Sequence, residues 1–283
     1  MLDYLNHYFK LDNHLVESNF PKNKKYFNTD IFYDYSPMLE LPLSIDDFKL
    51  THKKKFWYNI KRSSRLFEKD YGETYFETHK NKEAFNSLDP VREIFLKRWS
   101  TSYTSFFWKR DLGYKKFKEF INRIIIDYPD SFQISLLKIK SSNEIIAYSI
   151  GFELNNCYHF WMHSVNIKYS LSKFSVGTVF LNNLISHLII EGNIKNFDFM
   201  LGLNDYKLKW AKQKKNIYWR VKTNRSIFNI PKHIFIVLFY FIKIRIQKNK
   251  YLSNHIKKIF VSLERQKKLG SIFKILEQYV FKM

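Results

Sequence analysis

Apolar and polar residues alternate most clearly between Phe132 and Met200. Three short runs rich in β-branched and aromatic residues follow one another there, separated by turns of Asn and Ser. Runs of this kind joined by short polar turns are typical of consecutive β-hairpins. The pattern therefore predicts three antiparallel strands, at residues 132–139, 144–154 and 157–165.

A helix and a fourth strand follow. Apolar residues between Val176 and Glu191 recur at helical spacing, and Gly192 stands where such a helix would end. The next apolar run, residues 196–201, predicts a strand. A strand, a helix and another strand form a crossover, so the last two strands should be parallel. The predicted fold class is α/β, with a mixed, mostly antiparallel sheet, a central parallel crossover and flanking helices.

The sequence before this block predicts one extended segment and several helices. Tyr35–Pro42 contains two prolines and is expected to form an edge strand. Capping residues and apolar periodicity predict helices between Ser44 and Gly72, from Asp89 to Trp99 and from Tyr114 to Tyr128.

The sequence after the block becomes basic. A short helix is expected at 205–214 and a strand at 217–223, and the run Ile234–Ile242 is apolar on every side. We therefore expect three parts: an N-terminal region of an extended segment and helices at 1–127, a core at 128–226 and a basic helical tail at 227–283.

The charge of the chain leaves two alternatives open. The formal net charge is +22 at pH 7, which indicates either a Lys-rich solvated surface or an anionic partner: a phosphorylated cofactor, an acidic membrane surface or a nucleic acid. The segment Lys49–Arg65 concentrates seven Lys and Arg beside Trp57 and Tyr58. Such a mixture can bind nucleic acid by phosphate contacts and base stacking, although a solvated amphipathic helix explains the same pattern.

Location follows from what the sequence lacks. Cys157 is the single cysteine, the N-terminal residues lack the regions of a signal peptide, and no apolar run approaches the ~20 residues of a membrane-spanning helix. We therefore expect a cytoplasmic protein. The tail 227–283 either packs on the core or lies at an anionic membrane surface, which would make the protein peripheral to the inner face of the membrane. No metal-ligand spacing, Gly-rich nucleotide fingerprint or Gly-x-Ser-x-Gly is present, so no metal is expected.

Several short motifs stand in a fixed order along the chain. They are Tyr35-Ser36-Pro37-x-Leu39-x-Leu41-Pro42, Tyr58-Asn59-x-x-Arg62, Arg98-Trp99, Phe174-Ser175-Val176-Gly177, Phe197-Asp198-Phe199 and Gly202-x-x-x-Tyr206-Lys207-x-x-Trp210. The order of the predicted elements resembles the core of the GCN5-related N-acyltransferase (GNAT) superfamily. The motifs resemble its branch named after the cellulose-biosynthesis protein CelD, from about Tyr35 to Val221.

The resemblance implies an acyltransferase that uses acetyl-CoA or another acyl-CoA as co-substrate. It also implies a role in envelope polysaccharide or lipid synthesis, with an amino group, or less often a hydroxyl, on a sugar nucleotide, glycan precursor or lipid-linked intermediate as acceptor. A distant kinship with the Fem-type transferases, which take their acyl group from aminoacyl-tRNA, is implied as well. Residues 1–127 would then be a degenerate second copy of the fold or a helical extension.

The resemblance places the cofactor's pyrophosphate at the start of the helix 176–191. Backbone N–H groups and the helix dipole favour an anion there, and Gly177 lets the backbone approach closely. The superfamily pattern is Gln/Arg-x-x-Gly-x-Gly/Ala, whereas this chain has Ser172 and Ser175 at the first two of these positions. Lys173 could replace the missing charge. The expected cofactor-binding residues are Lys173, Ser175, Val176, Gly177 and Thr178.

Direct acyl transfer needs a base, a polarised carbonyl and a proton for the leaving thiolate. We expect Asp198, Tyr206 and Lys207 at the catalytic site. Asp198 is a candidate base, as are Glu153 and His163. Tyr206 is placed to protonate the thiolate, and Lys207 to hold an acidic acceptor or a cofactor phosphate. A bulge in the third strand could supply an oxyanion donor.

Simpler roles compete with these. Asp198 could only bind loop backbone, His163 could be an ordinary strand histidine, and Tyr206 and Trp210 could only pack a helix. Two alternative functions also stay open: a Fem-like transferase that binds tRNA through the basic segment 49–65, and a non-catalytic adaptor that binds the membrane surface through its tail.

Overall fold

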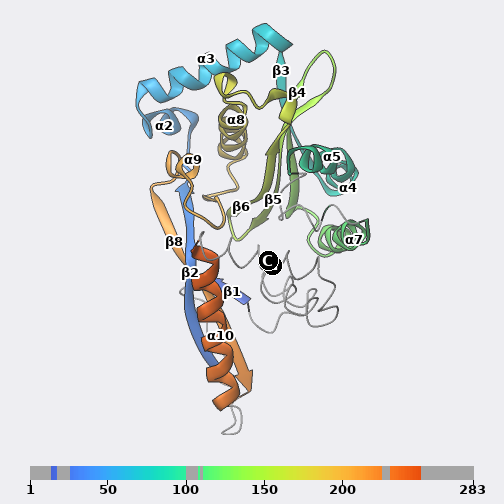
Figure 1. Ribbon diagram of the computed structural model, residues 1–283. Helices are drawn as coiled ribbons and strands as arrows, with labels where there is room; N and C mark the ends of the chain where they lie inside the picture. Colours follow the sequence, from blue (N-terminus) through green and yellow to red (C-terminus); the bar gives the residue numbers. More distant parts are fainter. Residues whose placement is uncertain (1–13, 18–25, 100–107, 109–110, 225–229, 250–283) are drawn as a thin grey trace, which may run out of the picture. The chain divides into compact units, whose positions relative to one another are not determined.

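The computed structural model describes residues 14–17, 26–99, 108, 111–224 and 230–249. The chain divides into two compact units, one formed by Met1–Asp34 with Asn216–Met283 and the other by Tyr35–Lys215. Each is described by itself (Figure 1). The part boundaries expected at 127 and 226 fall inside these units and remain predictions. The end of the expected tail, 250–283, lies outside the described residues.

The larger unit contains a mixed sheet with the strand order β2-β7-β6-β5-β4-β3. Neighbouring strands are antiparallel except β6 and β7, which are parallel. This confirms the predicted α/β class and the parallel crossover. The strands are β2 (Tyr26–Glu40, which enters this unit at Tyr35), β3 (Thr74–Lys80), β4 (Phe132–Ile139), β5 (Ile145–Leu154), β6 (Cys157–Val165) and β7 (Asn196–Asp198).

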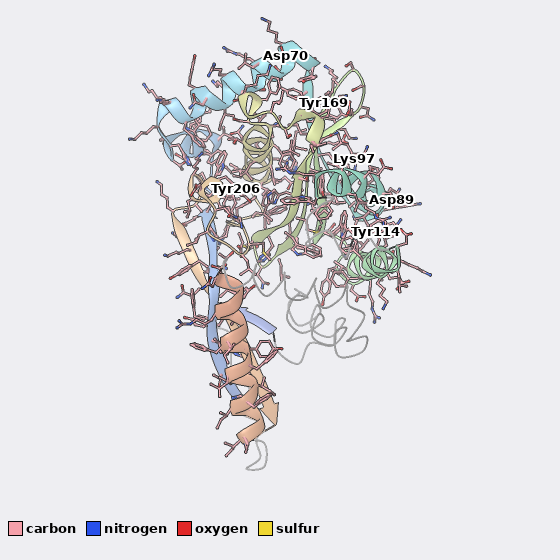
Figure 2. The ribbon with its side chains drawn as sticks, in the orientation of Figure 1. Asp70, Asp89, Lys97, Tyr114, Tyr169 and Tyr206 are labelled. Atoms are coloured by element: carbon pink, nitrogen blue, oxygen red, sulfur yellow. The ribbon has the colours of Figure 1, made fainter. Side chains whose placement is uncertain are left out.

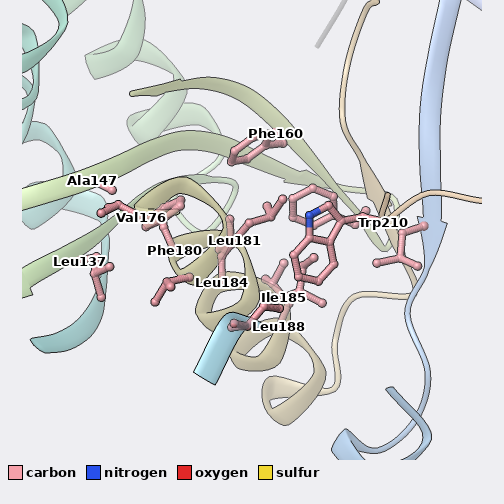
Figure 3. Packing of buried hydrophobic residues seen from close by; sticks show 14 of the residues in the cluster. Leu137, Ala147, Phe160, Val176, Phe180, Leu181, Leu184, Ile185, Leu188 and Trp210 are labelled. Carbon is pink, nitrogen blue, oxygen red and sulfur yellow. The ribbon is translucent and has the colours of Figure 1, made fainter. Parts of the chain in front are cut away.

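Helices cover both faces of this sheet (Figure 1). α2 (Ile45–Leu50), α3 (Lys54–Tyr71) and α8 (Val176–Glu191) lie on one face, and α4 (Asn81–Asn86), α5 (Leu88–Trp99) and α7 (Asp111–Asp127) on the other. α8 forms the crossover between β6 and β7. It buries eight side chains around most of its circumference, because it packs against the sheet on one side and α3 on another. Figure 3 shows several of these side chains.

Local chemistry fixes where the N-terminal helices begin and end. The Ser44 hydroxyl accepts the Asp47 N–H at 3.0 Å and caps α2. α2 stops at Thr51, whose N–H and hydroxyl both bind the Phe48 carbonyl, so the predicted helical stretch is two helices. Gly72 ends α3 with φ +101°, a conformation that glycine adopts readily.

The smaller unit is built from both ends of the chain. β1 (His14–Glu17) pairs antiparallel with β8 (Gln213–Asn224), and β8 lies beside the first part of β2. α10 (Ile230–Lys248) packs through Ile244 and neighbouring side chains on Ile31 and Val221. A buried ion pair joins the two segments, because the fully buried Arg220 guanidinium donates to both carboxylate oxygens of Asp30 at 2.7 and 2.8 Å.

Four expectations need correction. β2 is not an edge strand, since it has β8 beside it in one unit and β7 in the other. β3 and α4 were not predicted, because half-buried β3 shows no clear alternation. β7 ends at Asp198 because Met200 takes φ +58° and donates its N–H to the Asp198 carboxylate. α9 (Asp205–Leu208) is shorter than expected, and β8 begins earlier, at Gln213.

Candidate active site

The parallel strands β6 and β7 stay together for only three residue pairs, ending at His159 and Asp198. The chain after β7 remains with β2, because Phe199 and Gly202 donate their N–H groups to carbonyls of β2. β6 continues to Val165 against β5. Within the described residues, no strand pairs with positions 160–165 on the side that faced β7. That edge of β6 can therefore receive an extended ligand by backbone hydrogen bonds.

A β-bulge lies in the same part of β6. Gly151 of β5 pairs with Phe160 and Ile150 pairs with Met162, which leaves Trp161 as an extra residue. Bulges change the direction of backbone groups and often occur beside active sites. The expected bulge in the third strand is thus confirmed, while the role of its N–H as an oxyanion donor remains a prediction.

His163 and Tyr206 form a hydrogen-bonded pair next to this edge. The Tyr206 hydroxyl lies 3.1 Å from His163 Nε2, and the imidazole stacks on Phe160 with ring centroids 4.4 Å apart. Tyr206 stands at the start of α9 (Figure 2). With the Tyr206 hydroxyl as donor, Nε2 accepts this hydrogen bond and Nδ1 carries the proton of the neutral ring, whereas the other tautomer reverses the two roles.

The surroundings favour the uncharged form of both members of the pair. Although His163 is an exposed residue of β6, desolvation by the surrounding protein, and then the positive charges of Lys207 and Arg98, lower its pKa to about 4. Burial raises the pKa of Tyr206 to about 12. The arrangement therefore presents a neutral imidazole as proton acceptor and a protonated phenol as proton donor.

Asp198 is buried and surrounded by hydrogen-bond donors. Its Oδ1 accepts the Ser36 hydroxyl and the Met200 N–H, the latter at 2.8 Å, and its Oδ2 lies 3.5 Å from His159 Nδ1. Burial alone would raise the pKa of Asp198, but hydrogen bonds from His159 and Ser36 hold it below its usual value. This geometry ties β2, β6 and the turn after β7 together. A role as base remains a prediction.

Lys207 points its ammonium group at the backbone. The side chain is buried, and Nζ donates to the carbonyls of Met200 and Leu201 at 3.0 and 2.6 Å. It thereby stabilises the loop between β7 and α9 and brings a positive charge near His163. Its expected contact with an acceptor or a phosphate remains a prediction.

The N-terminus of α8 fits an anionic ligand. Ser175 stands before the helix with φ +44°, and its carbonyl accepts the N–H groups of Thr178 and Val179. The N–H groups of the first helical residues, Val176 and Gly177, have no partner within a helix and carry the positive end of its dipole. Gly177 is exposed, and a Cβ there would meet only the Val165 side chain, at 3.6 Å. The backbone is thus open to a phosphate at this turn.

Lys173 lies beside the same turn, and its side chain forms an ion pair with Asp70. Its Nζ is 3.0 Å from the Asp70 carboxylate of α3 and 4.4 Å from the centre of the Phe174 ring. The pair is exposed (Asp70 is labelled in Figure 2), so a phosphate could replace the carboxylate at little cost.

A protein-family profile described as an acetyltransferase (GNAT) domain matches residues 54–208, more than half of the chain. This chain belongs to the GNAT acetyltransferase family. The match runs from α3 to α9 and includes the His163–Tyr206 pair and the start of α8. The resemblance to the superfamily is thereby confirmed, while the finer CelD-like branch remains a prediction. No curated protein sequence matches the chain.

Several solved structures are similar to this one at low sequence identity. A conserved protein of unknown function from Bacteroides thetaiotaomicron is 9% identical, with a TM-score of 0.46 over 70% of this chain and 62% of that one. The C-terminal domain of a putative lysylphosphatidylglycerol synthetase from Agrobacterium fabrum is 11% identical, with a TM-score of 0.45 over 70% of this chain and 62% of that one. FemX is 10% identical, with a TM-score of 0.46 over 77% of this chain and 68% of FemX. The chain thus spans about 62% of the first two structures.

Two absences complete the description of the site. In the part of the chain that the structure describes, no group of His, Cys, Asp and Glu is arranged to hold a metal ion. None of the helices described has the length and apolarity of a bilayer-spanning segment.

The sequence analysis did not identify the roles of two residues of the candidate site. His159 was not singled out, because only the β6–β7 register places it opposite Asp198. Arg98 belongs to the Arg98-Trp99 motif, but the sequence analysis assigned it no function. Its guanidinium donates to the Val165 carbonyl at 3.2 Å, at the end of the free β6 edge.

Proposed function

We propose that this GNAT protein transfers an acyl group from an acyl-CoA to a neutral amine. The observation that carries the proposal is the His163–Tyr206 pair, 3.1 Å apart beside the edge of β6 that no described strand pairs with. A neutral base and a protonated acid in contact are the two proton-transfer groups that aminolysis of a thioester requires.

The chain offers a place for each part of the acyl donor. The N–H groups of Val176 and Gly177 would hold the pyrophosphate, with Lys173 adding charge. The free edge of β6, residues 160–165, would hold the extended arm by backbone hydrogen bonds. The acyl-CoA supplies an activated thioester carbonyl. The backbone at the Trp161 bulge would stabilise the negative charge on its oxygen.

The proton steps use the pair as a relay. The amine nitrogen attacks the carbonyl carbon and becomes acidic, and the Tyr206 oxygen takes its proton while the phenolic proton passes across the hydrogen bond to His163 Nε2. As the carbon–sulfur bond breaks, Tyr206 donates its proton to the sulfur, which yields the amide and a free thiol. His163 Nε2 then returns its proton to the Tyr206 oxygen. Desolvation, and after it the charges of Lys207 and Arg98, would favour a neutral His163 at the start of each cycle.

The acceptor proposed is an amino group of a sugar nucleotide, glycan precursor or lipid-linked envelope intermediate, with polysaccharide or cell-envelope synthesis as its setting. The support for this acceptor and setting is the motif resemblance to the CelD-like branch. We place the reaction in the cytoplasm on the sequence features given above, the single cysteine among them.

Calorimetric titration with acetyl-CoA, beside free CoA and bulk tRNA, tests the donor. We expect micromolar binding of both CoA species, lost in Gly177→Trp because the indole fills the open side of the turn. Ile190→Trp is the matched control, since Ile190 is an exposed position at the other end of α8. Unchanged binding in Gly177→Trp would remove the phosphate site. Release of thiol with amino-sugar nucleotides then tests the acceptor.

A transferase that uses aminoacyl-tRNA is the second candidate. One observation favours it: α3 exposes a row of cations in which Arg62 and Arg65 are one turn apart, the others being Lys54, Lys55, Lys61 and Lys69. Salt-sensitive tRNA binding that falls in Arg62→Glu with Arg65→Glu, together with no CoA binding, would favour this donor over acyl-CoA.

A further inference from the structure

The helix α10 exposes a continuous row of large apolar side chains. Phe235 is 71% exposed, and Leu238 and Ile242 are each 55% exposed. Their spacing of three and four residues puts them on one face. This exposed stripe consists of Ile230, Ile234, Phe235, Leu238, Phe241 and Ile242.

The opposite face of α10 is already occupied. Ile236, Val237, Tyr240 and Ile244 pack with residues of β2 and β8 in the same unit, and the His233 ring lies 2.8 Å from the Thr29 hydroxyl. A surface helix normally turns charged residues to water. α10 is apolar on both faces, so its outward face is built for contact with something apolar.

The charged residues of α10 indicate which kind of partner its exposed face contacts. α10 contains no Asp or Glu, and cations stand on both sides of its apolar run, at Lys232 before it and at Lys243, Arg245 and Lys248 after it. Arg245 is exposed, and its guanidinium lies 5.0 Å from the centre of the Phe241 ring. Two copies of this stripe in contact would bring these cations together. An anionic surface would instead pair with them.

We propose that the exposed stripe of α10 binds the interface of an anionic phospholipid bilayer. The apolar side chains enter the boundary between headgroups and acyl chains, and the exposed Arg245 beside them meets lipid phosphates. The helix lies in the plane of the membrane because its other face stays on its own sheet. This binding does not depend on the proposed acyl transfer.

Vesicle co-sedimentation of the full chain tests the proposal. The probes are vesicles of phosphatidylcholine alone and of phosphatidylcholine mixed with phosphatidylglycerol. We expect binding to the mixed vesicles only. The double variant Phe235→Ser with Leu238→Ser keeps the charge and should bind roughly a hundredfold more weakly, because two side chains lose their apolar contact.

A matched pair of exposed leucines in the larger unit provides the control. Leu43 is 98% and Leu50 is 83% exposed, so Leu43→Ser with Leu50→Ser should bind like the wild type. Circular dichroism checks that all variants fold. Equal binding of the stripe variant and the wild type would overturn the proposal, and so would the absence of wild-type binding. A dimer that the stripe variant disrupts, without vesicle binding, would assign the stripe to a second copy instead.

Discussion

His159 Nδ1 lies 3.5 Å from Asp198 Oδ2, so an imidazolium and a carboxylate face each other across the parallel β6–β7 pair. Burial opposes the charge on His159, but the hydrogen bond with Asp198, followed by the contribution of Cys157, raises its pKa from 6.5 to about 9. The pKa of Asp198 is lowered below 3.8. The pair therefore holds the two strands together before they part.

This pair should make stability depend on pH. A raised His159 pKa contributes stability that is complete below pH 6.5 and is lost as the pH rises through 9. The lowered Asp198 pKa contributes stability that is present above 3.8 and is lost as the pH falls through the lowered pKa. We expect Asp198→Asn to lower the free energy of unfolding by about 3 kcal/mol near pH 6, because it leaves a buried partner unpaired.

Urea unfolding between pH 6 and 9 measures this. The wild type should lose stability over the range and Asp198→Asn should lose less. Lys140→Gln, which removes an exposed Lys–Glu pair, serves as the control and should keep the wild-type slope. An equal slope in Asp198→Asn would show that the pair carries no pH dependence.

Tyr206→Phe should lower kcat about a hundredfold and leave the affinity for acetyl-CoA unchanged, because it removes a proton donor and no binding group. His163→Gln should cost a similar factor. The double variant should be no slower than the worse single variant, since both residues serve one relay. Steady-state kinetics with calorimetric affinities measures this, and independent, multiplying effects would argue against a relay.

The charge state of His163 can be observed directly. We expect its imidazole to titrate well below 6.5, because desolvation and two cations lower its pKa to about 4. Arg98→Gln should raise that pKa, since Arg98 is one of the cations. Titration followed by NMR measures both. A His163 that titrates at its ordinary value, with no response to Arg98→Gln, would rule out the electrostatic setting of the relay.

Gly151→Ala should destabilise the sheet by about 2 kcal/mol or more. A Cβ at Gly151 would lie 2.2 Å from the Tyr158 ring and hydroxyl, which are fully buried and cannot move aside. Gly177→Ala is the matched glycine, because its Cβ would meet one side chain at ordinary contact distance. Thermal unfolding should separate the two variants clearly. Equal melting temperatures would contradict the packing argument.

Lys173→Ala should weaken acetyl-CoA binding several-fold, because its ammonium group is proposed to contact a phosphate. Asp70→Ala should strengthen binding slightly, because it releases the ammonium group from its present partner. Equal binding by both variants, with a change in stability of less than about 1 kcal/mol, would instead mark the two residues as a surface ion pair only. Calorimetry on the two variants distinguishes these outcomes.

Periodicity predicted the strongly patterned elements well. β4, β6 and α8 have the expected limits because each is bounded by turn or capping residues and has a clear apolar pattern. β3 was missed because every residue in it is half-buried, so no alternation marks it. The end of β7 depends on the Asp198 carboxylate accepting the Met200 N–H, which apolar spacing cannot reveal.

The site was predicted less completely than the fold. Tyr206 and His163 were both candidates, but their contact joins residues 43 positions apart and depends on how α9 packs. Lys207 was expected to face a ligand, and the structure directs it to the carbonyls of Met200 and Leu201. Sequence indicates which residues carry chemistry, whereas long-range packing decides which of them meet.

The larger unit is inserted between the two chain segments that form the smaller unit. The unit with the GNAT site is one uninterrupted segment, Tyr35–Lys215, and its ends meet, because Lys214 Nζ lies 4.1 Å from the centre of the Tyr35 ring. A segment with adjoining ends can be transplanted or circularly permuted with little strain. The unit that carries α10 could thus have been exchanged in evolution around an unchanged GNAT domain, and an engineer could graft this domain into a different carrier.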